Sequence, residues 1–170
     1  MFIKDLERLY GKRPGKLKIL KLLVSNTNIQ CIALLRLQNC LFNKKVPFIP
    51  TLIKNLNLFL TGADIGIGVE IGKGLIIRHS NGIVVGRGAV IGDNCTLLQQ
   101  VTIGEKYGDG SDPTHRYPSI GNNVTLSAGA KIIGPIILGD NVVVGANAVV
   151  IKDVPNNSVA VGIPAVYKEK

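Results

Sequence analysis

The sequence predicts a mainly β protein: a parallel β-helix of six-residue repeats over residues 62–170, preceded by a small α-helical segment over residues 1–61. Three observations predict this fold. Before Gly62, apolar residues recur at helical spacing. After Gly62, an aliphatic residue recurs at every sixth position, and a glycine often follows it. The length of 170 residues suits one domain with a small appendage.

The N-terminal segment contains two predicted helices. One follows Pro50, which suits the first turn of a helix, and Gly62 suits the position just after its end. Its apolar stripe consists of Leu52, Ile53, Leu56, Phe59 and Leu60. The other is expected from about residue 29 to residue 42. One face of that helix carries Cys31, Leu34, Leu35, Leu41 and Phe42.

The six-residue period continues along the rest of the chain. Its aliphatic positions are Ile65, Ile71, Ile77, Val85, Ile91, Leu97, Ile103, Ile120, Leu126, Ile132, Leu138, Val144 and Val150. A six-residue repeat forms one short strand and one turn, three repeats close a triangular coil, and successive coils stack. The aliphatic side chains are therefore expected to form ladders inside a prism, with glycines at crowded turns.

The period is interrupted twice, and both histidines lie at the interruptions. Between Ile77 and Val85 the chain has two residues more than one repeat, and His79 lies there. Between Ile103 and Ile120 the repeat is lost altogether, which predicts an extruded loop at about 105–119 that contains His115. Because long loops on rigid scaffolds usually carry function, both interruptions are candidate sites.

The net charge of +9 lies entirely within residues 1–60, which carry eleven Lys or Arg and two acidic residues. Residues 61–170 carry nine charges of each sign. The excess indicates either a solvated basic face or a patch that meets something anionic, such as a phosphorylated substrate or, peripherally, an anionic membrane surface. No recognition motif or aromatic interleaving accompanies the charge, so no nucleic acid is expected as a partner.

The cysteine pattern and the N-terminus indicate a cytoplasmic protein. The chain has three cysteines and no C-x-x-C pair, which argues against a disulfide framework. We interpret all of them as small buried hydrophobic residues: Cys31, Cys40 and Cys95. Charged residues from Lys4 to Glu7 interrupt any early apolar run, so no signal peptide is expected.

Five segments resemble the serine O-acetyltransferase family of hexapeptide transferases, which also includes sugar O-acetyltransferases of surface polysaccharide pathways. These segments are 48–62, 64–86, 98–104, 154–155 and 162–165. The resemblance implies a left-handed parallel β-helix, opposite in hand to the usual crossover. It also implies an acyltransferase that uses acetyl-CoA as acetyl donor and assembles as a homotrimer.

By this resemblance His79 is the general base that takes the proton from an acceptor hydroxyl, a task that suits imidazole near neutral pH. Asp64, fifteen residues earlier, corresponds to the carboxylate that orients this histidine. A backbone N–H near Gly104 is expected to stabilise the oxyanion. The alternatives are a histidine that is merely a polar turn residue and an Asp64 that caps the junction between helix and wall.

The resemblance also implies that acetyl-CoA lies in a groove between neighbouring subunits, against the C-terminal coils. Small residues that leave room for the pantetheine arm are expected at Ala128, Gly129 and Ala146. Lys131 and Lys152 are candidates for the CoA phosphates, or else solvated lysines at the corners of the prism.

The sequence determines the acceptor less closely than the acetyl donor. In the family, an Asp before the catalytic histidine and an Asp-Pro pair hold the amino group of serine; here these positions are Arg78 and Arg13. Since a guanidinium repels an ammonium, we expect the hydroxyl of a sugar in a surface polysaccharide or its precursor. Further candidate acceptor residues are His115, Arg116 and Tyr117. Serine O-acetylation for cysteine biosynthesis and amino-sugar N-acetylation are the alternatives.

Two other classes of protein fit less well. A zinc-dependent β-helix enzyme needs three histidine ligands, and the chain has two histidines, so no metal is expected. A purely structural β-helix would account for the repeat but not for the placement of Asp64 and His79.

Overall fold

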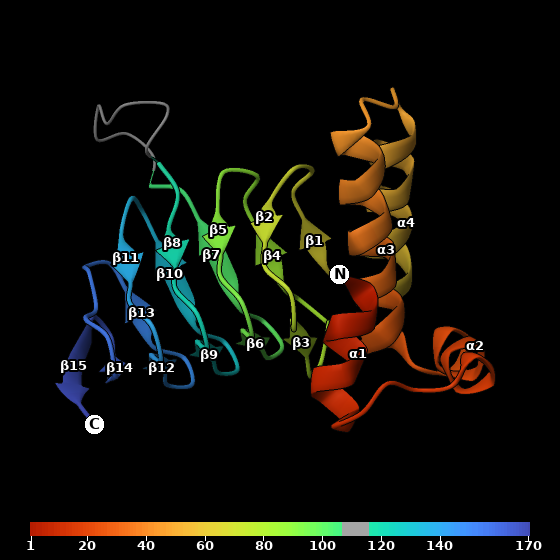
Figure 1. Cartoon of the computed structure of the whole chain (residues 1–170). Helices are drawn as coiled ribbons and strands as arrows, with labels where there is room; N and C mark the ends of the chain where they lie inside the picture. The colour runs from red at the N-terminus through yellow and green to blue at the C-terminus, as the bar shows by residue number, and fades with distance from the viewer. Residues whose placement is uncertain (107–115) are drawn as a thin grey trace.

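The structure is a computed structural model that describes residues 1–106 and 116–170. Four helices precede the strands: α1 (Phe2–Tyr10), α2 (Lys16–Ser25), α3 (Thr27–Asn43) and α4 (Ile49–Thr61). They gather at one end of a long prism of strands (Figure 1). Helix α4 ends at Gly62, whose φ of 71° is the left-handed conformation that glycine adopts readily. None of the helices within the described residues is long and apolar enough to cross a membrane.

The strands form three walls. They are β1 (Asp64–Ile65), β2 (Glu70–Ile71), β3 (Ile76–Ile77), β4 (Val84–Val85), β5 (Val90–Ile91), β6 (Thr96–Leu97), β7 (Thr102–Gly104), β8 (Ser119–Ile120), β9 (Thr125–Leu126), β10 (Lys131–Ile133), β11 (Ile137–Leu138), β12 (Val143–Val144), β13 (Val149–Val150), β14 (Ser158–Gly162) and β15 (Ala165–Glu169). The first wall is β1-β4-β7-β10-β13, the second β2-β5-β8-β11, and the third β3-β6-β9-β12-β14-β15. All pairings are parallel except β14 with β15. Successive strands thus visit the walls in turn, as a β-helix requires.

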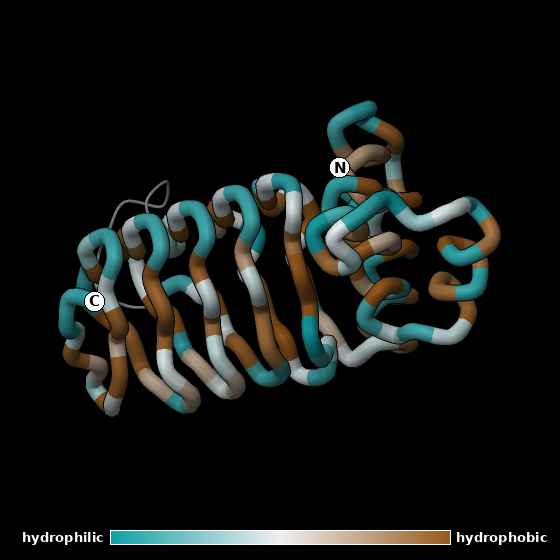
Figure 2. Tube along the Cα trace, turned by 60° about the horizontal axis from the view of Figure 1, so that its bottom comes forward, coloured by the Kyte–Doolittle hydropathy of each residue, from teal (hydrophilic) through white to brown (hydrophobic). Residues whose placement is uncertain are grey.

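The predicted aliphatic ladder forms the core. All thirteen aliphatic positions lie within β1 to β13, and all are buried. Their neighbours in the chain are mostly half-buried or exposed, which gives apolar wall segments separated by hydrophilic turns (Figure 2). Each coil buries side chains that it could not bury alone, so stability depends on stacking.

Three coils differ in length from the regular coil of three repeats. In the first, Asp64 pairs with Val84, so this coil is two residues longer. In another, Thr102 pairs with Lys131, and the chain between them includes the predicted loop. In the last, Val143 pairs with Val159, so this coil is two residues shorter, a contraction that the sequence analysis missed. In every case the strands stay in register, so insertions and deletions are confined to the turns.

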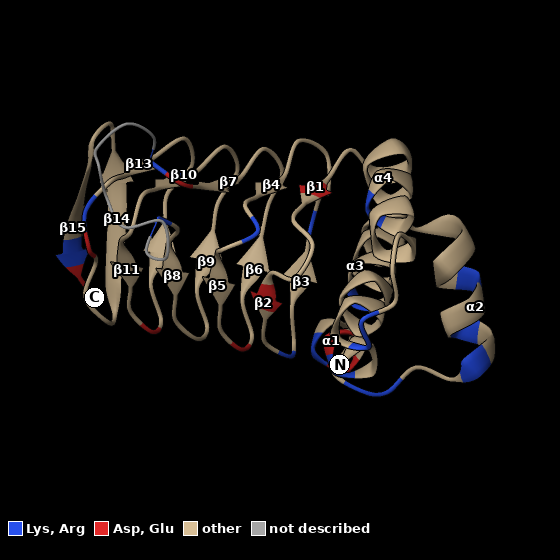
Figure 3. Ribbon diagram, turned by 90° about the horizontal axis from the view of Figure 1, so that it is seen from above, with Lys and Arg blue, Asp and Glu red and all other residues tan. Residues whose placement is uncertain are grey.

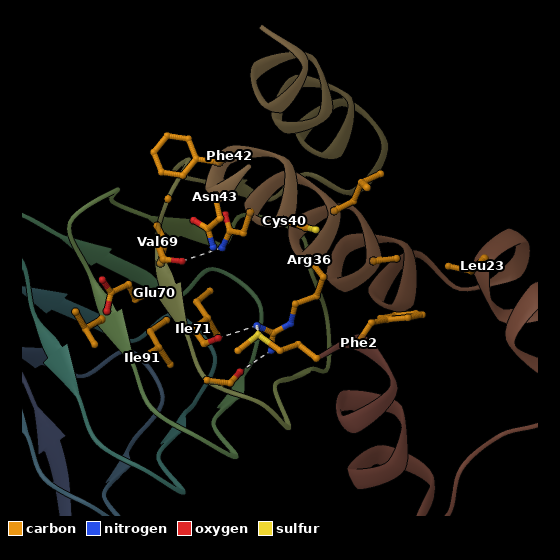
Figure 4. Close-up of a pocket in the computed structure, with 17 residues that line it drawn as sticks. Phe2, Leu23, Arg36, Cys40, Phe42, Asn43, Val69, Glu70, Ile71 and Ile91 are labelled. Carbon is orange, nitrogen blue, oxygen red and sulfur yellow. Dashed lines mark hydrogen bonds between the residues drawn. The ribbon is translucent and has the colours of Figure 1, made fainter. Parts of the chain in front are cut away.

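A buried ion pair fixes the helices to the first coil. Arg36 of α3 contacts both carboxylate oxygens of Asp5 in α1, each at 2.9 Å. Arg36 also donates to the carbonyl of Ile71 at 2.7 Å (Figure 4). Asp5 is 1% exposed and accepts a further bond, from the N–H of Leu75, at 2.9 Å. Because a buried charge needs such compensation, the pair fixes how the helices sit on the prism.

One sequence expectation about burial is wrong, that for Cys40, and the apolar stripe of α4 is not the face that packs. Most of the predicted apolar stripe of α4 faces outward, with Leu52 61% and Phe59 86% exposed. The opposite face of the helix packs instead, through Asn57 and Thr61. Cys40 is exposed, whereas Cys31 and Cys95 are buried as expected.

Candidate active site

The turns that join the third wall to the first form one continuous edge of the prism, here called the His79 edge. It consists of residues 78–83, 98–101, 127–130 and 145–148. Backbone hydrogen bonds of 2.9–3.0 Å stack these turns, from Gln100 N–H to Asn81, from Gly129 N–H to Gln99, and from Asn147 N–H to Ala128. The first turn carries the two extra residues of the lengthened first coil. His79 therefore protrudes where the edge departs from its regular form.

The surroundings of His79 come from the helices. Its side chain is exposed, whereas Ser80 is buried and donates its hydroxyl to the carbonyl of Thr61 at 2.9 Å. Asn28 of α3 accepts from the N–H of Ser80 at 3.0 Å and donates to the carbonyl of Arg78 at 2.5 Å. A cavity of about 440 Å³ lies beside His79, lined by the start of α3, the end of α4 and residues 79–81.

Asp64 is engaged with a helix and not with His79. Its carboxylate lies 2.7 Å from the ammonium of Lys54 in α4. Within residues 1–106 and 116–170, no hydrogen bond or ion pair joins Asp64 to His79. Across the wall Asp64 pairs with Val84, so His79 lies five residues before the strand partner of Asp64. The contact with Lys54 agrees with the alternative that Asp64 acts at the junction between helix and wall, and its role toward His79 stays a prediction.

The two arginine candidates, Arg78 and Arg13, lie in different connecting segments. Arg78 is exposed next to His79. Arg8 lies near it, and the pKa of Arg8 is lowered, first by burial and also by the repulsion of Arg78. Arg13 lies in the exposed linker between α1 and α2, where Lys and Arg are concentrated (Figure 3). The placement of Arg13 and Arg78 at one acceptor site stays a prediction.

A second group of predicted site residues lies on another edge, here called the loop edge, where the first wall joins the second. Gly104 ends β7 and Lys152 follows β13, so both lie on this edge, with Arg116 and Tyr117 before β8. Sheet pairing separates the two edges by the width of the first wall. A single chain therefore does not bring Arg116, Tyr117, Gly104 or Lys152 to His79. His115 lies outside the described residues.

Tyr117 has a packing role. Its ring covers Gly86 and Gly88, where an added Cβ would collide with ring carbons. Burial raises the pKa of Tyr117, and the neighbouring carboxylate of Glu105 raises it further. The phenol therefore holds the end of the loop against the preceding turn.

The small residues predicted for acetyl-CoA lie on the His79 edge. Ala128 is half-buried, Gly129 is buried and Ala146 is exposed, in turns that stack on one another. Lys131 begins β10 beside this edge and donates to the carbonyl of Gln100 at 2.5 Å. The structure thus places four of the six predicted cofactor residues along one line from His79, the exceptions being Gly104 and Lys152.

A larger cavity lies elsewhere. Its volume is about 1070 Å³, and it lies between α1, α3 and the strands β2 and β5 (Figure 4). It contains no histidine and one carboxylate, Glu70, so it offers no acid–base pair. No group of three His, Cys, Asp or Glu able to hold a metal occurs in the described part of the chain.

Comparison with known proteins identifies the family. Residues 117–152 match the family described as bacterial transferase hexapeptide (six repeats). A serine acetyltransferase of Helicobacter pylori strain 26695 is 39% identical over 161 residues, which cover 95% of this chain and 92% of that protein. The chain belongs to the serine acetyltransferase family.

Two relatives that are longer than this chain are also serine acetyltransferases. A serine acetyltransferase of Synechococcus elongatus is 37% identical over 94% of this chain, and the chain spans 64% of that protein's length. A Brucella abortus serine acetyltransferase, solved in complex with coenzyme A, superposes with a TM-score of 0.86 at 29% identity and covers 99% of this chain and 66% of that one. The predicted family and the left-handed parallel β-helix are confirmed. The sugar acceptor is not supported, since these relatives are serine acetyltransferases.

Proposed function

We propose that the chain transfers the acetyl group of acetyl-CoA to the hydroxyl of L-serine, with His79 as general base. The observation that carries the proposal is the 39% identity to the Helicobacter pylori serine acetyltransferase across 92% of that protein. This is the alternative acceptor of the sequence analysis. Serine takes precedence over a sugar as the proposed acceptor, because similarity over 95% of this chain is stronger evidence than the arginines at positions 13 and 78.

His79 removes the proton from the serine hydroxyl as the oxygen attacks the thioester carbonyl carbon. The tetrahedral intermediate collapses with cleavage of the carbon–sulfur bond, and the imidazolium returns its proton to the leaving thiolate. O-acetylserine and coenzyme A result. His79 is exposed beside a cavity of about 440 Å³, so an acceptor as small as serine can reach the imidazole.

Acetyl-CoA would run along the His79 edge. Three small residues, Ala128, Gly129 and Ala146, lie in these stacked turns, along which a narrow chain such as pantetheine is proposed to run. The Brucella abortus relative with bound coenzyme A supports a CoA site in this fold. Lys131 and Lys152 lie on different edges, so only Lys131 is proposed to meet the same CoA molecule as His79 in one chain.

The site is proposed to be completed in a homotrimer. His79 and Arg116 lie on opposite sides of the first wall, so an acceptor that meets both must lie between two chains. Mixing His79→Ala chains with Arg116→Ala chains tests this arrangement, because a shared site restores activity in some mixed trimers. Two inactive variants that stay inactive after mixing, in a protein with the mass of a monomer, would exclude the shared site.

Release of the CoA thiol from acetyl-CoA measures the reaction. We expect turnover with L-serine, reduced at least about a hundredfold in His79→Ala because general-base catalysis is lost. The same assay is carried out with neutral sugars, amino sugars and nucleotide sugars as acceptors. A His79→Ala variant as active as the original chain, with any acceptor, would contradict the role of His79.

A sugar hydroxyl on an anionic carrier is the second candidate acceptor, favoured by the exposed guanidinium of Arg78 beside His79. Turnover with a nucleotide sugar and none with serine would establish it. In that case Arg78→Ala should raise the KM for the anionic acceptor. If serine is the acceptor, Arg78→Asp should lower the KM for serine, because a carboxylate attracts its ammonium group.

Contact of the basic segment with an anionic membrane surface stays a prediction. Helix α2 has no buried residue, and Leu17, which is 82% exposed, lies between Lys16 and Lys18. Such an amphipathic, cationic helix suits an anionic bilayer. Co-sedimentation with phosphatidylglycerol vesicles, compared with phosphatidylcholine vesicles, measures the contact.

A further inference from the structure

Among the residues that the structure describes, the histidine proposed as the base is held through its backbone and not through its side chain. The imidazole of His79 is exposed, and no hydrogen bond or ion pair to it occurs among residues 1–106 and 116–170. A general base must nevertheless stay within hydrogen-bond reach of the hydroxyl that it deprotonates. The turn that carries His79 is two residues longer than its equivalents in regular coils, so the prism alone does not fix its shape.

Asn28 supplies the missing constraint. Its side-chain NH₂ group donates to the carbonyl of Arg78 at 2.5 Å, and its side-chain oxygen accepts from the N–H of Ser80 at 3.0 Å. These two groups belong to the residues immediately before and after His79. A single side chain from helix α3 thus holds both sides of the histidine.

The amide is chemically suited to this place. The carbonyl of Arg78 can only accept and the N–H of Ser80 can only donate, so one orientation of the Asn28 amide satisfies both. Aspartate would keep the bond to Ser80 but would place a carboxylate oxygen against the carbonyl of Arg78. Leucine would make neither bond.

The contact rests on a rigid base. Asn28 is the second residue of the 17-residue helix α3, whose N-cap side chain, Asn26, accepts from the N–H of Ile29 at 3.1 Å. On the other side, Ser80 is 4% exposed and bonded to Thr61 at the end of α4. Helices α3 and α4 therefore both hold the turn that projects His79.

We propose that Asn28 is the positioning residue for His79, and that its amide sets the direction of the imidazole by fixing the peptide groups on either side of it. The proposal rests on the proposed role of His79 as base. It gives the N-terminal helices a function in catalysis, in addition to closing the prism.

The chain offers a matched control. Asn39, on the same helix, donates through its side-chain NH₂ group to the carbonyl of Val69 at 2.8 Å. It ties α3 to the first coil by the same kind of bond, but in the turn between β1 and β2, away from His79. Asn28→Ala and Asn39→Ala therefore each remove an amide contact between the same helix and the same coil.

We expect Asn28→Ala to lower kcat at least about tenfold with the KM for acetyl-CoA within about twofold, because misplacement of a base by about 1 Å costs up to a hundredfold. Asn39→Ala should keep kcat within about twofold. Asn28→Asp, which retains one of the two bonds, should lie between the original chain and Asn28→Ala. Equal kcat values in Asn28→Ala and Asn39→Ala would overturn the proposal.

Imidazole NMR signals give a readout that needs no substrate. The chain has two histidines, so the His79→Ala variant assigns both signals. In Asn28→Ala the His79 signal should shift or broaden while the His115 signal stays, and in Asn39→Ala neither should change. An unchanged His79 signal in Asn28→Ala would refute the positioning role. Full activity of His79→Ala would instead refute the proposed function, so the two failures are distinct.

Discussion

Helices α1 and α3 cover the first coil at the N-terminal end of the prism, whereas at the C-terminal end the chain covers the last coil with its own β14–β15 hairpin. At the N-terminal end, charged and amide side chains donate to wall carbonyls: Arg8 to Gly74, Arg36 to Ile71, Gln38 to Ile65 and Asn39 to Val69. At the C-terminal end, β15 pairs with β14 through backbone hydrogen bonds and packs Ala165 against the core, and its other side chains are exposed.

The difference shows two solutions to one problem. The last strand of any wall leaves N–H and C=O groups unpaired, and such edges invite aggregation. The hairpin extends the third wall mainly through backbone pairing, and Lys170 next to it donates to the carbonyl of Asn141 at 2.5 Å. The helices satisfy wall groups with long-range contacts that also fix the turn of His79, so the end with the more specific closure is the end that carries the proposed base.

Among these substitutions, Asp5→Ala is expected to lower the free energy of unfolding most. It leaves the guanidinium of Arg36 buried without its carboxylate, and breaking a buried pair in this way costs about 3–5 kcal/mol. Lys4→Ala, which breaks the exposed Lys4–Glu7 pair, should cost at most about 0.5 kcal/mol. Denaturant unfolding measures both free energies. A cost for Asp5→Ala as small as that of Lys4→Ala would mean that the ion pair does not secure the N-terminal end.

A pH effect should come from Cys31, which lies on α3 in the core shared with the first coil. Burial raises the pKa of Cys31 from 9.0 to about 11. The unfolded chain then ionises this thiol at lower pH than the folded chain does. The free energy of unfolding is therefore highest below pH 9 and falls as the pH rises toward 11, by about 2 kcal/mol.

The Cys31→Ala variant isolates this contribution from other groups that titrate in the same range. Its stability should fall less steeply between pH 9 and 11 than that of the original chain. Parallel curves for the two proteins would show that Cys31 ionises as readily in the folded chain as in the unfolded one.

The smallest loss in the free energy of unfolding is expected from a substitution at the C-terminal end. Tyr167 of β15 pairs with Ala160 of β14 and is 50% exposed, so Tyr167→Ala should cost below about 1 kcal/mol. Amide hydrogen exchange adds a local measure. The β14–β15 amides should exchange faster than those of β1 and β4. The reverse order would mean that the hairpin is the firmer of the two closures.

The six-residue period predicted the core because each aliphatic position acts through its neighbours one coil away. It failed after Val150, since the next ladder position is Val154 and not residue 156. Val154 is buried, pairs with Leu138 and is followed six residues later by buried Ala160. The sequence therefore contained a signal for the shortened coil. The six-residue period starts again at Val154, two residues earlier than a regular repeat after Val150 would place it.

The site was predictable only in part. His79 stood out because it lies at an interruption of the repeat. Asn28 and Lys54 left no such signal, because their contacts depend on how the helices dock onto the prism. The expected contact of Asp64 with His79 came from the family resemblance, whereas in the structure Asp64 pairs across the wall with Val84 and meets Lys54.

Two lengthened coils and one shortened coil occur in the same prism without disturbing the register of its walls. Length changes are accommodated in the turns, while the aliphatic ladder stays continuous. Mutation can therefore lengthen or shorten one turn, and so alter an acceptor site, without rebuilding the core on which folding depends. In this scaffold, new specificity and the retention of the fold are separable steps in evolution.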